Sequence, residues 1–264
     1  MALSDEELDR YARHLVLREI GGLGQARLAR ARVLVVGAGG LGSPVILYLA
    51  AAGVGTIGIV DFDTVSLSNL QRQIAHRTTD IGRLKTDSAS EAARAINPGV
   101  TVRTHPLRLS KENTLQLIEE YDIVADGSDN FGTRFLVNDA CYLTHKTLVS
   151  AAVTEFDGQL ATYKPHAGDY PCYRCLFPAP PPPGTAPSCS ETGILGAAAG
   201  VLGTLQALET VKEILGIGET LAGSLLIYDA LATRFRTVRV RRDPECRLCG
   251  PAAEIRDLCH SDDP

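Results

Sequence analysis

The sequence feature that most constrains the fold is a glycine-rich turn that follows a short apolar run. Residues 33–36 are consecutive aliphatic residues and predict a short buried strand. Gly37, Gly39 and Gly42 then follow the pattern G-x-G-x-x-G, and the apolar stretch at 43–52 predicts a helix. A glycine turn between a buried strand and a helix N-terminus lets backbone N–H groups come close to a phosphate. The stretch therefore predicts a nucleotide site, without selecting the nucleotide or the reaction.

An acidic residue follows the next apolar run. Residues 57–60 predict a second buried strand, and Asp61 comes directly after it. In dinucleotide-binding folds a carboxylate at this point of the chain accepts a hydrogen bond from a ribose hydroxyl. We therefore expect Asp61 to contact the ribose of the nucleotide.

The composition argues against several classes of protein. The chain has 264 residues, 45% of them hydrophobic, and a formal net charge of −5 without a long basic block, which disfavours binding to nucleic acid. The first ten residues are polar and acidic, unlike a signal peptide, and the apolar stretch at 193–216 carries Glu209, Lys212 and Glu213, unlike a membrane span. Seven cysteines without a secretory segment indicate a reducing, cytoplasmic setting. We expect neither a nucleic-acid partner nor membrane association.

Strand-like and helix-like stretches alternate over the first 152 residues. Strands are predicted at about 56–61, 100–105, 123–126 and 147–152, and helices at about 85–95, 115–120 and 131–145. At the N-terminus a helix is predicted over residues 5–18, and Gly21, Gly22 and Gly24 are expected to end it. The alternation predicts an α/β fold with a Rossmann-like, mainly parallel sheet that is covered by helices on both faces.

The pattern changes after about residue 153. An antiparallel strand pair is predicted over 153–163, and a segment rich in proline, glycine and cysteine follows it. A long apolar helix begins near residue 193, and two more strands are predicted at 224–228 and 234–240. We therefore expect antiparallel strands to continue the parallel sheet.

Two C-x-x-C pairs, Cys172 with Cys175 and Cys246 with Cys249, lie on either side of the long apolar helix. Four thiolates in two such pairs suit a closed tetrahedral zinc site. A redox dithiol in one pair is the alternative, but two matched pairs in a reducing compartment favour a metal. Because four cysteine ligands leave no open position, we expect a structural role, in which the clasp ties the C-terminal strand to the proline-rich segment.

Polar and cationic residues follow the predicted strand that leads to Asp61. Asn69, Arg72 and Lys85 follow in the next polar connection and at the start of a predicted helix. Two cations near a nucleotide suit a triphosphate and an anionic leaving group. Ordinary solvated surface charge is the alternative for each of them.

A second polar group lies at the end of the predicted strand 123–126. Asp126, Asp129 and Asn130 are placed where ligands bind in an open α/β sheet, at the carboxyl ends of the strands. A carboxylate there can hold Mg²⁺ through oxygen. Alternatively, Asp129 or Asn130 only caps the following helix, and Asp126 only closes the strand.

Three cysteines lie outside the C-x-x-C pairs. Cys189 comes just before a predicted helix, and a cysteine near a helix N-terminus can have a lowered pKa and act as a nucleophile. A passive loop cysteine is the alternative. Cys141, within a predicted helix, and Cys259, near the C-terminus, are expected to be inert.

Taken together, the motifs resemble those of a known family. They are R-Y-A-R-H-L at 10–15, G-G-L-G-Q at 21–25, the glycine turn, D-F-D-T-V-S-L-S-N-L-Q-R-Q at 61–73, G-R-L-K at 82–85, D-G-S-D-N at 126–130 with Thr133 and Arg134, and the two C-x-x-C pairs. In this combination the chain resembles the MoeB/ThiF adenylyltransferases, relatives of the ubiquitin-activating enzymes. The resemblance extends over about residues 5–250.

The resemblance implies one domain with two parts. We expect an adenylation domain at 1–250, with a nucleotide-binding part at about 1–152, a carrier-binding and zinc part at about 153–250, and a polar tail at 251–264. Such enzymes use ATP and Mg²⁺ to activate the C-terminal glycine of a small ubiquitin-like sulfur carrier (MoaD/ThiS-like, ending in Gly-Gly). The products are an acyl-adenylate and pyrophosphate. The carrier then becomes a thiocarboxylate for molybdopterin or thiamine thiazole synthesis.

The resemblance also assigns roles to matching positions. It implies nucleotide contacts at Gly40, Asp61, Ser68, Asn69, Leu70, Gln71 and Arg72, phosphate contacts at Arg72 and Lys85, and support of Mg²⁺ by Asp129 with Asn130 beside it. Arg13 would reach the phosphates of a neighbouring subunit, which requires a homodimer. Cys189 falls in the family's crossover segment, where a cysteine can form a thioester or persulfide link.

The partners beyond the carrier are less determined. Longer relatives carry a rhodanese domain after the adenylating domain, whereas this sequence ends soon after the second C-x-x-C pair. We therefore expect a separate protein as the sulfur donor, either a cysteine desulfurase or a rhodanese. The R-Y-A-R-H pattern at 10–14 slightly favours the molybdopterin branch, and one enzyme could serve both branches.

Three other functions compete with adenylylation of a carrier. A nicotinamide-dependent oxidoreductase would explain the glycine turn and Asp61, but it leaves Arg72, Lys85 and the four paired cysteines unused. A non-catalytic scaffold that docks a carrier would not need the phosphate-site residues. An enzyme that adenylylates a tRNA base would need a basic face, which the charge balance disfavours.

Overall fold

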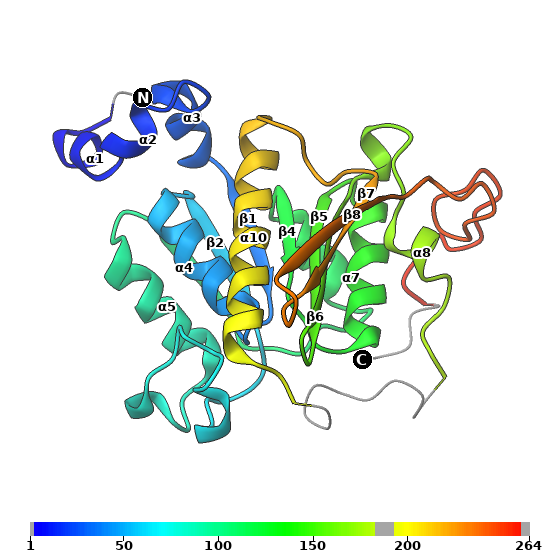
Figure 1. The fold of residues 1–264 in the computed structure, drawn as a ribbon, viewed down its shortest axis with the longest axis horizontal. Helices are drawn as coiled ribbons and strands as arrows, with labels where there is room; N and C mark the ends of the chain where they lie inside the picture. Colours follow the sequence, from blue (N-terminus) through cyan, green and yellow to red (C-terminus); the bar gives the residue numbers. More distant parts are fainter. Residues whose placement is uncertain (1–2, 183–192, 260–264) are drawn as a thin grey trace.

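In the computed structural model, the described residues are 3–182 and 193–259. Within these ranges eight strands form one sheet in the order β3-β2-β1-β4-β5-β6-β7-β8 (Figure 1). The strands are β1 (Arg32–Val36), β2 (Thr56–Val60), β3 (Thr101–His105), β4 (Ile123–Asp126), β5 (Thr147–Thr154), β6 (Asp157–Tyr163), β7 (Ser224–Asp229) and β8 (Arg234–Arg239). Strands β1 to β5 pair in parallel, and β5 to β8 pair antiparallel. The predicted parallel sheet with an antiparallel continuation is confirmed.

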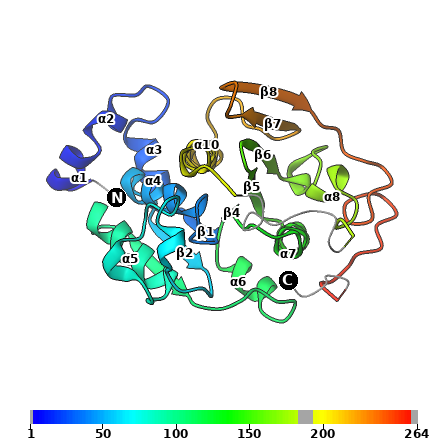
Figure 2. The same ribbon diagram turned by 60° about the horizontal axis from the view of Figure 1, so that its bottom comes forward.

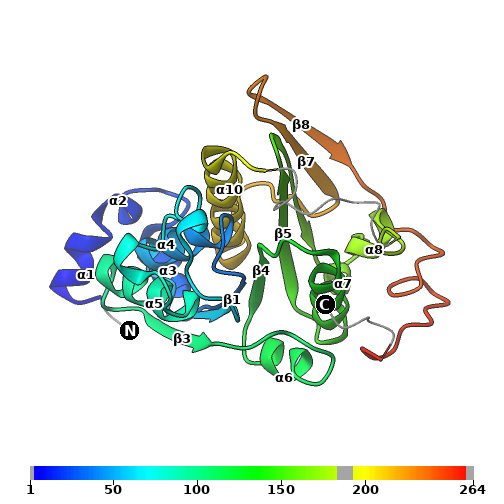
Figure 3. The same ribbon diagram turned by 90° about the horizontal axis from the view of Figure 1, so that it is seen from below.

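Helices cover both faces of the parallel part. The helices are α1 (Asp5–Arg10), α2 (Ala12–Leu15), α3 (Gly21–Leu28), α4 (Gly42–Ala52), α5 (Lys85–Ile96), α6 (Thr114–Glu119), α7 (Phe131–Leu143), α8 (Tyr173–Leu176) and α10 (Gly196–Leu215), with short 3-10 turns η1 (Leu67–Asn69), η2 (Thr78–Asp80) and η3 (Pro165–Ala167). Figures 2 and 3 show α4, α5 and α10 on one face of the sheet and α6 and α7 on the other. The arrangement is a three-layer α/β sandwich.

The alternation of side chains along β1 explains these layers. Val33 and Val35 pack into one apolar core with α4, α5 and α10, whereas Leu34 and Val36 pack into a second core with α6 and α7. Successive side chains of a strand point to opposite faces, so a continuous apolar run is buried only when both faces are covered. A third core joins α10 to β5 and β6.

The strand order reverses at β1, the topological switch point of the sheet. The chain passes from β1 to β2 on one side, and β4 pairs with β1 on the other. Val36 is in register with both Val60 and Asp126. Three adjacent strands therefore end side by side, and they are followed by the glycine turn, Asp61 and the D-G-S-D-N segment. This edge is the crevice where ligands bind in such sheets.

The N-terminal segment differs from the single helix predicted over 5–18. Ser4 does cap α1, and a capping box joins its side chain to Glu7. However, the segment forms two short helices, α1 and α2, and Gly21 begins α3 with φ +55° instead of ending a helix. The third helix forms because Gln25 and Leu28 are fully buried against the rest of the chain. Tertiary packing outweighs the low helix propensity of glycine here.

The segment after the last strand is not entirely solvent-exposed. Ile255 and Leu258 are buried, and they pack beside the paired cysteines and against the α6–α7 core respectively. Among the described helices, including the 20-residue α10, none has the length and apolar character needed to cross a membrane.

Candidate active site

A cavity of about 650 Å³ opens at the carboxyl ends of β1, β2 and β4. Of the residues predicted to contact the nucleotide, its lining includes Gly37, Gly39, Gly40, Asp61, Arg72, Lys85, Asp129 and Asn130. A cavity of this size suits a nucleotide-sized ligand. Groups that are separated by up to 93 residues in the sequence therefore converge on one space.

The glycine turn owes its shape to two positions. Gly37 has φ +86°, a conformation that favours glycine. A Cβ on Gly42 would lie 1.8 Å from the carbonyl oxygen of Gly37, so only glycine lets the first turn of α4 pack against the loop. Gly39 and Gly40 instead line the cavity. The predicted pattern thus divides into glycines that shape the turn and glycines that leave room for a ligand.

Asp61 links the end of β2 to the glycine turn. Its Oδ2 accepts a hydrogen bond from the Ala38 backbone N–H at 2.8 Å, and its Oδ1 accepts one from the Asp63 N–H at 2.8 Å. Burial raises the pKa of Asp61, although the positive charge of Lys85 and these hydrogen bonds oppose the rise. Each carboxylate oxygen retains capacity for another donor, which a ribose hydroxyl can use.

Lys85 reaches the cavity from the first residue of α5. It is only 6% exposed, and its Nζ donates to Asp63 Oδ2 at 2.7 Å. The ion pair holds the ammonium at the cavity wall, where a phosphate could replace the half-exposed carboxylate of Asp63 as its partner.

Arg72 belongs to the connection between β2 and α5. Its Nη1 donates to the carbonyl oxygen of Ser68 at 3.1 Å, and its side chain lies beside Gly40. The predicted contacts Ser68, Asn69, Leu70 and Gln71 occupy the preceding turn and are not part of the cavity lining. Asn69 closes that turn through Ser66, and Gln71 donates to the carbonyl oxygen of Ile194 at 3.5 Å.

The acidic group after β4 separates into three roles. Asp126 is completely buried and accepts hydrogen bonds from the Ser128 N–H and the Ser150 hydroxyl; burial raises its pKa. Asn130 caps α7 by accepting from the Thr133 N–H at 2.8 Å. Asp129 is exposed and lines the cavity. Both alternatives, strand closure by Asp126 and capping by Asn130, are therefore present, and Asp129 is the carboxylate best placed for a cation.

Two buried polar atoms of the cavity lining have no hydrogen-bond partner among the described residues. They are the Ser128 hydroxyl oxygen and Gln73 Oε1. Such atoms are costly to bury unless a ligand or water satisfies them. Together with the open space over Gly39 and Gly40, they fit a polar ligand with several hydrogen-bonding groups, as a nucleotide is.

Some residues of the cavity were not predicted as site residues. Arg108 lies over the ring of Phe62, 4.3 Å from its centroid, and both line the cavity. No pattern marks Arg108, whereas Phe62 is part of the motif at 61–73. Ser128 and Gln73 do lie inside motifs quoted above, so the motifs contained the signal without showing which side chains face the ligand.

Arg13 lies far from the cavity of its own subunit. It is an exposed residue of α2, which packs on α3, and α3 leads into the start of β1. The cavity lies at the other end of that strand. Figure 1 shows α1 to α3 grouped at one corner of the molecule. Cys189, predicted as a nucleophile, lies outside the described residues.

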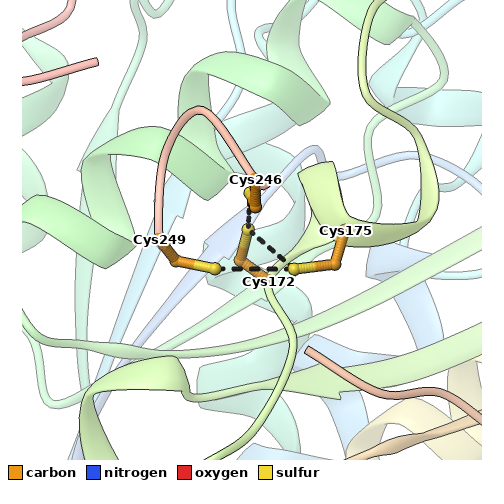
Figure 4. A group of neighbouring side chains, drawn as sticks. All are labelled: Cys172, Cys175, Cys246 and Cys249. Atoms are coloured by element: carbon orange, nitrogen blue, oxygen red, sulfur yellow. Dashed lines mark hydrogen bonds between the residues drawn. The ribbon is translucent and has the colours of Figure 1, made fainter. Parts of the chain in front are cut away.

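The four paired cysteines converge at a separate site. The Sγ–Sγ distances are 3.8 Å for Cys172 and Cys175, 3.6 Å for Cys172 and Cys246, and 3.5 Å for Cys175 and Cys249 (Figure 4). All four sulfurs lie within 4.8 Å of one another. Tetrahedral zinc with Zn–S bonds of about 2.3 Å requires sulfurs about 3.8 Å apart. This cysteine clasp therefore fits the predicted metal.

Helix α7 anchors the clasp to the sheet. Arg174, between the first two cysteines, donates to both carboxylate oxygens of Asp139, at 2.7 and 2.6 Å. The Tyr173 N–H donates to Asn138 Oδ1 at 2.8 Å. Cys141 on the same helix is buried, which raises its pKa far above the ordinary value and fits the expected inert role.

Comparison with known proteins identifies the family. A model of the "ThiF family" matches residues 11–248, which is most of the chain. The chain belongs to the ThiF family. A Thermus thermophilus protein named "Sulfur carrier protein adenylyltransferase" is 51% identical over 98% of this chain and 96% of its own length. The predicted resemblance to the MoeB/ThiF adenylyltransferases is confirmed.

Two other relatives in the ThiF family are longer. "Probable adenylyltransferase/sulfurtransferase MoeZ" of Mycobacterium tuberculosis is 53% identical over 98% of this chain and 66% of its own length. "Adenylyltransferase and sulfurtransferase MOCS3" of Bos taurus is 51% identical over 97% of this chain and 56% of its own length. The chain thus spans between about half and two thirds of these two proteins.

Solved structures with the same fold include E. coli MccB. MccB with MccA-N7isoASN has a TM-score of 0.79 at 23% identity, covering 94% of this chain and 75% of that one. MccB with ATP has a TM-score of 0.77 at 24% identity, covering 92% and 74%. At this identity the likeness establishes the fold of this ThiF-family chain.

Proposed function

We propose that this protein uses ATP to adenylylate the C-terminal glycine carboxylate of a small ubiquitin-like sulfur carrier. The observation that carries the proposal is the convergence of Arg72, Lys85 and Asp129 with the glycine turn on one cavity. The names of the relatives in Thermus thermophilus, Mycobacterium tuberculosis and Bos taurus support adenylyl transfer, and the first of them names a sulfur carrier.

The reaction joins two anions, so its barrier is largely electrostatic. A carboxylate oxygen of the carrier forms a bond to the α-phosphorus of ATP. The bond from that phosphorus to the bridging oxygen breaks, and the electron pair leaves with pyrophosphate. Arg72 and Lys85 offer positive charge at the cavity wall, where it can offset the repulsion and stabilise the leaving group. No protein nucleophile is required for this step.

Asp129 is the residue that we propose holds Mg²⁺. Its exposed carboxylate lines the cavity, and carboxylate oxygens are the ligands that Mg²⁺ prefers. When bound, the ion supplies charge neutralisation on the phosphates. Asp61 and the turn at Gly39 and Gly40 would hold the nucleoside end of ATP, with Ser68 to Gln71 lying over it once the ligand is bound.

The carrier tail has an accessible route to the cavity. Helix α7 contacts β4 and β5, and on that face β6 and β7 carry exposed or half-buried residues such as Gln159 and Ile227. Arg134 of α7 belongs to the cavity lining and also lines a small hollow on this face together with Ala152 and Gln159. We infer that the Gly-Gly tail runs extended over this open face, in the part of the chain (about 153–250) that would bind the carrier.

Arg13 completes the site only if a second copy of the chain supplies it. Because its own cavity lies at the opposite end of β1, the arginine can reach phosphates only in another subunit. Exposed apolar side chains near α2 and on α3, α4 and α10 give that copy a surface, since α3 contacts both α2 and α10, and α10 contacts α4: Val16, Leu23, Tyr48 and Leu208 are 77%, 85%, 55% and 55% exposed. Large exposed apolar groups of this kind mark subunit contacts. We therefore propose a homodimer.

The remaining roles complete the proposal. The cysteine clasp would hold one structural zinc ion, and Cys189 would act after adenylylation. A cytoplasmic location and a separate sulfur donor, a cysteine desulfurase or a rhodanese, stay predictions. The carrier could belong to the molybdopterin or the thiamine thiazole branch. Neither an oxidoreductase nor a non-catalytic scaffold has support from the relatives.

ATP–pyrophosphate exchange tests the proposed function. The purified protein is assayed with a carrier from each branch, either intact or lacking its last glycine. We expect exchange that depends on an intact carrier, because the terminal carboxylate must reach the α-phosphate. The truncated carriers are the matched control. Absence of exchange with both intact carriers would refute the function.

A further inference from the structure

A buried histidine lies directly behind the glycine turn. His76 is 7% exposed and follows the turn that carries Arg72. Its Nε2 lies 2.9 Å from the carbonyl oxygen of Ala38, and its Nδ1 lies 2.8 Å from the hydroxyl oxygen of Ser88. None of the roles proposed above uses this side chain.

The carbonyl contact determines which ring nitrogen carries the proton. A carbonyl oxygen only accepts hydrogen bonds, so Nε2 must donate and therefore bears hydrogen. In the neutral ring Nδ1 is then an acceptor, and the Ser88 hydroxyl can donate to it. Ser88 also lies 2.8 Å from Asp80 Oδ2, which gives its single proton two acceptors. Asp80 holds other donors, the Arg77 N–H and Arg83 Nη1, and does not depend on Ser88 alone.

The two peptide groups on either side of Ala38 are each held by a side chain. Its N–H donates to Asp61, and its carbonyl oxygen faces His76. Ala38 itself is completely buried, and the next two residues, Gly39 and Gly40, line the cavity. A rotation of the Ala38–Gly39 peptide would leave its buried carbonyl without a partner, which carries a substantial cost. The two side chains therefore restrict the path of the turn at the point where it meets the ligand.

Ser88 also connects this arrangement to the phosphate site. It lies on α5 one turn after Lys85, so the chain Ala38–His76–Ser88 ties the glycine turn to the helix that carries the lysine. The charged groups that face the histidine are Asp61, Asp80 and Lys85. Burial lowers the pKa of His76, and Lys85 acts in the same direction, which favours the neutral ring near pH 7.

We propose that His76 is a positioning residue for ATP: the neutral ring, with its proton on Nε2, holds the Ala38 carbonyl and thereby sets the glycine turn against the nucleotide, and Ser88 keeps the ring in this orientation through Nδ1. The inference rests on the proposed ATP-dependent function. It assigns Ser88 an indirect role, because the hydroxyl touches neither the turn nor the cavity lining.

Two serines of α5 provide a matched comparison. Ser88 and Ser90 are both buried, at 2% and 3% exposure, but the Ser90 hydroxyl has no hydrogen-bond partner among the described residues. Ser88→Ala removes the hydroxyl that holds Nδ1 of the His76 ring, and Ser90→Ala removes an equal volume without touching the ring. We expect Ser88→Ala to weaken ATP binding about three- to tenfold, as the loss of one oriented hydrogen bond predicts, with kcat within about twofold. Ser90→Ala should bind ATP like the wild type.

The tautomer is read directly by nitrogen-15 NMR of histidine-labelled protein. The His76 signals are assigned by their loss in His76→Gln. We expect a protonated Nε2 and an unprotonated Nδ1 in the wild type and in both serine variants, with the Nδ1 resonance shifted only in Ser88→Ala, where the hydrogen bond to that nitrogen is lost. The Gln amide N–H can donate to the Ala38 carbonyl and has no tautomers. His76→Gln should therefore retain most ATP affinity, and adding Ser88→Ala to His76→Gln should cause no further loss of ATP affinity.

The outcomes separate this inference from the proposed function. An Nδ1–H tautomer in the wild type, or equal ATP affinity in Ser88→Ala and Ser90→Ala, would overturn the positioning role while leaving carrier adenylylation intact. A wild-type protein that does not bind ATP would overturn both, and equilibrium binding of ATP without a carrier detects that case.

Discussion

The nucleotide cavity and the cysteine clasp are built on opposite principles. The cavity lies where several strands end, and polar groups in or next to it have unfavourable surroundings. They are the Ser128 hydroxyl, which has no hydrogen-bond partner among the described residues, the poorly exposed Lys85, and the buried Asp126, which directly precedes the lining residue Gly127. The clasp lies beside the sheet, on the short helix α8 and the segment after β8, and its four sulfurs lie close to one another. The sheet therefore holds the cavity in shape, whereas the shape of the clasp would depend on a metal held by its four cysteines.

The difference predicts how substitutions divide. Changes at the cavity should reduce activity and leave stability nearly unchanged or improved, since the sheet holds its shape. Changes at the clasp should reduce stability and leave the chemistry of the cavity nearly unchanged. Each prediction below tests one side of this division.

Lys85→Ala should have the largest effect. Removing a charge aimed at the departing phosphates costs a factor of about 10² to 10³ in turnover in comparable electrostatic sites. Carrier-dependent exchange measures the loss, and urea unfolding should show little change because, among the described residues, the ammonium forms its ion pair with the half-exposed Asp63. Lys111→Ala, at an exposed lysine, is the control. Unaltered exchange in Lys85→Ala would favour a carrier-docking scaffold.

A mixture of two inactive variants tests whether the cavity is shared between subunits. Arg13→Ala and Lys85→Ala alone should both be deficient in exchange. In a mixed twofold dimer, one site carries both changes and the other carries neither. After subunit exchange in an equal mixture, half of the dimers are mixed, so activity should recover to about a quarter of the wild-type value. Recovery no greater than the sum of the separate variants would mean that Arg13 does not act in the partner's site.

Cys246→Ser should affect stability more than chemistry. Metal analysis should show that bound zinc falls from about one ion per chain to none, because a structural site needs four ligands. The free energy of unfolding should fall by about 3 kcal/mol or more, a fraction of the ~10–16 kcal/mol that zinc contributes to small metal-dependent domains. ATP affinity should stay within about twofold of the wild type. Cys259→Ser, at an exposed cysteine, is the control. A tenfold loss of ATP affinity would show that α7 couples the clasp to the cavity. It would contradict the division in which clasp changes affect stability and cavity changes affect activity.

Local spacing predicted the parts of the cavity that share one β-α unit. The glycine turn, Asp61 and Lys85 lie on such units, where the chain order itself fixes which end of the sheet each residue reaches. Ser128 and His76 could not be assigned in this way, because their contacts depend on which strands become neighbours. The pairing of β1 with β4 follows from long-range packing.

The clasp divides similarly into predictable and unpredictable parts. The two C-x-x-C spacings predicted which four cysteines come together, since such spacing is suited to one metal ion. The anchor of Arg174 on Asp139 was not visible, because an arginine between two cysteines reads as solvated charge until α7 is placed beside it. The helix α3, where the glycines were predicted to end a helix, also required tertiary contacts, those that bury Gln25 and Leu28.

The smallest expected effect contrasts the two ends of β4. Burial raises the pKa of Asp126 at the cavity, so its charged form is less favourable in the folded than in the unfolded chain. Burial would also raise the pKa of Asp122, just before the strand, but hydrogen bonds from Arg32 outweigh it and lower that pKa. The two carboxylates should therefore contribute to stability with opposite signs as the pH rises.

Urea unfolding of Asp126→Asn and Asp122→Asn between about pH 3 and 7 measures this contrast. Asp126 destabilises the fold progressively as the pH rises from the ordinary aspartate pKa through its raised value, so Asp126→Asn should gain stability relative to the wild type over that range. Asp122 stabilises the fold above the ordinary pKa and loses that contribution as the pH falls through its lowered value. Asp122→Asn should therefore lose stability relative to the wild type as the pH rises. If the stabilities of both variants, relative to the wild type, changed in the same direction with pH, the charged form of Asp126 would be no less favourable in the folded chain than that of Asp122. The proposed division between a strained cavity and a stable scaffold would then fail at Asp126.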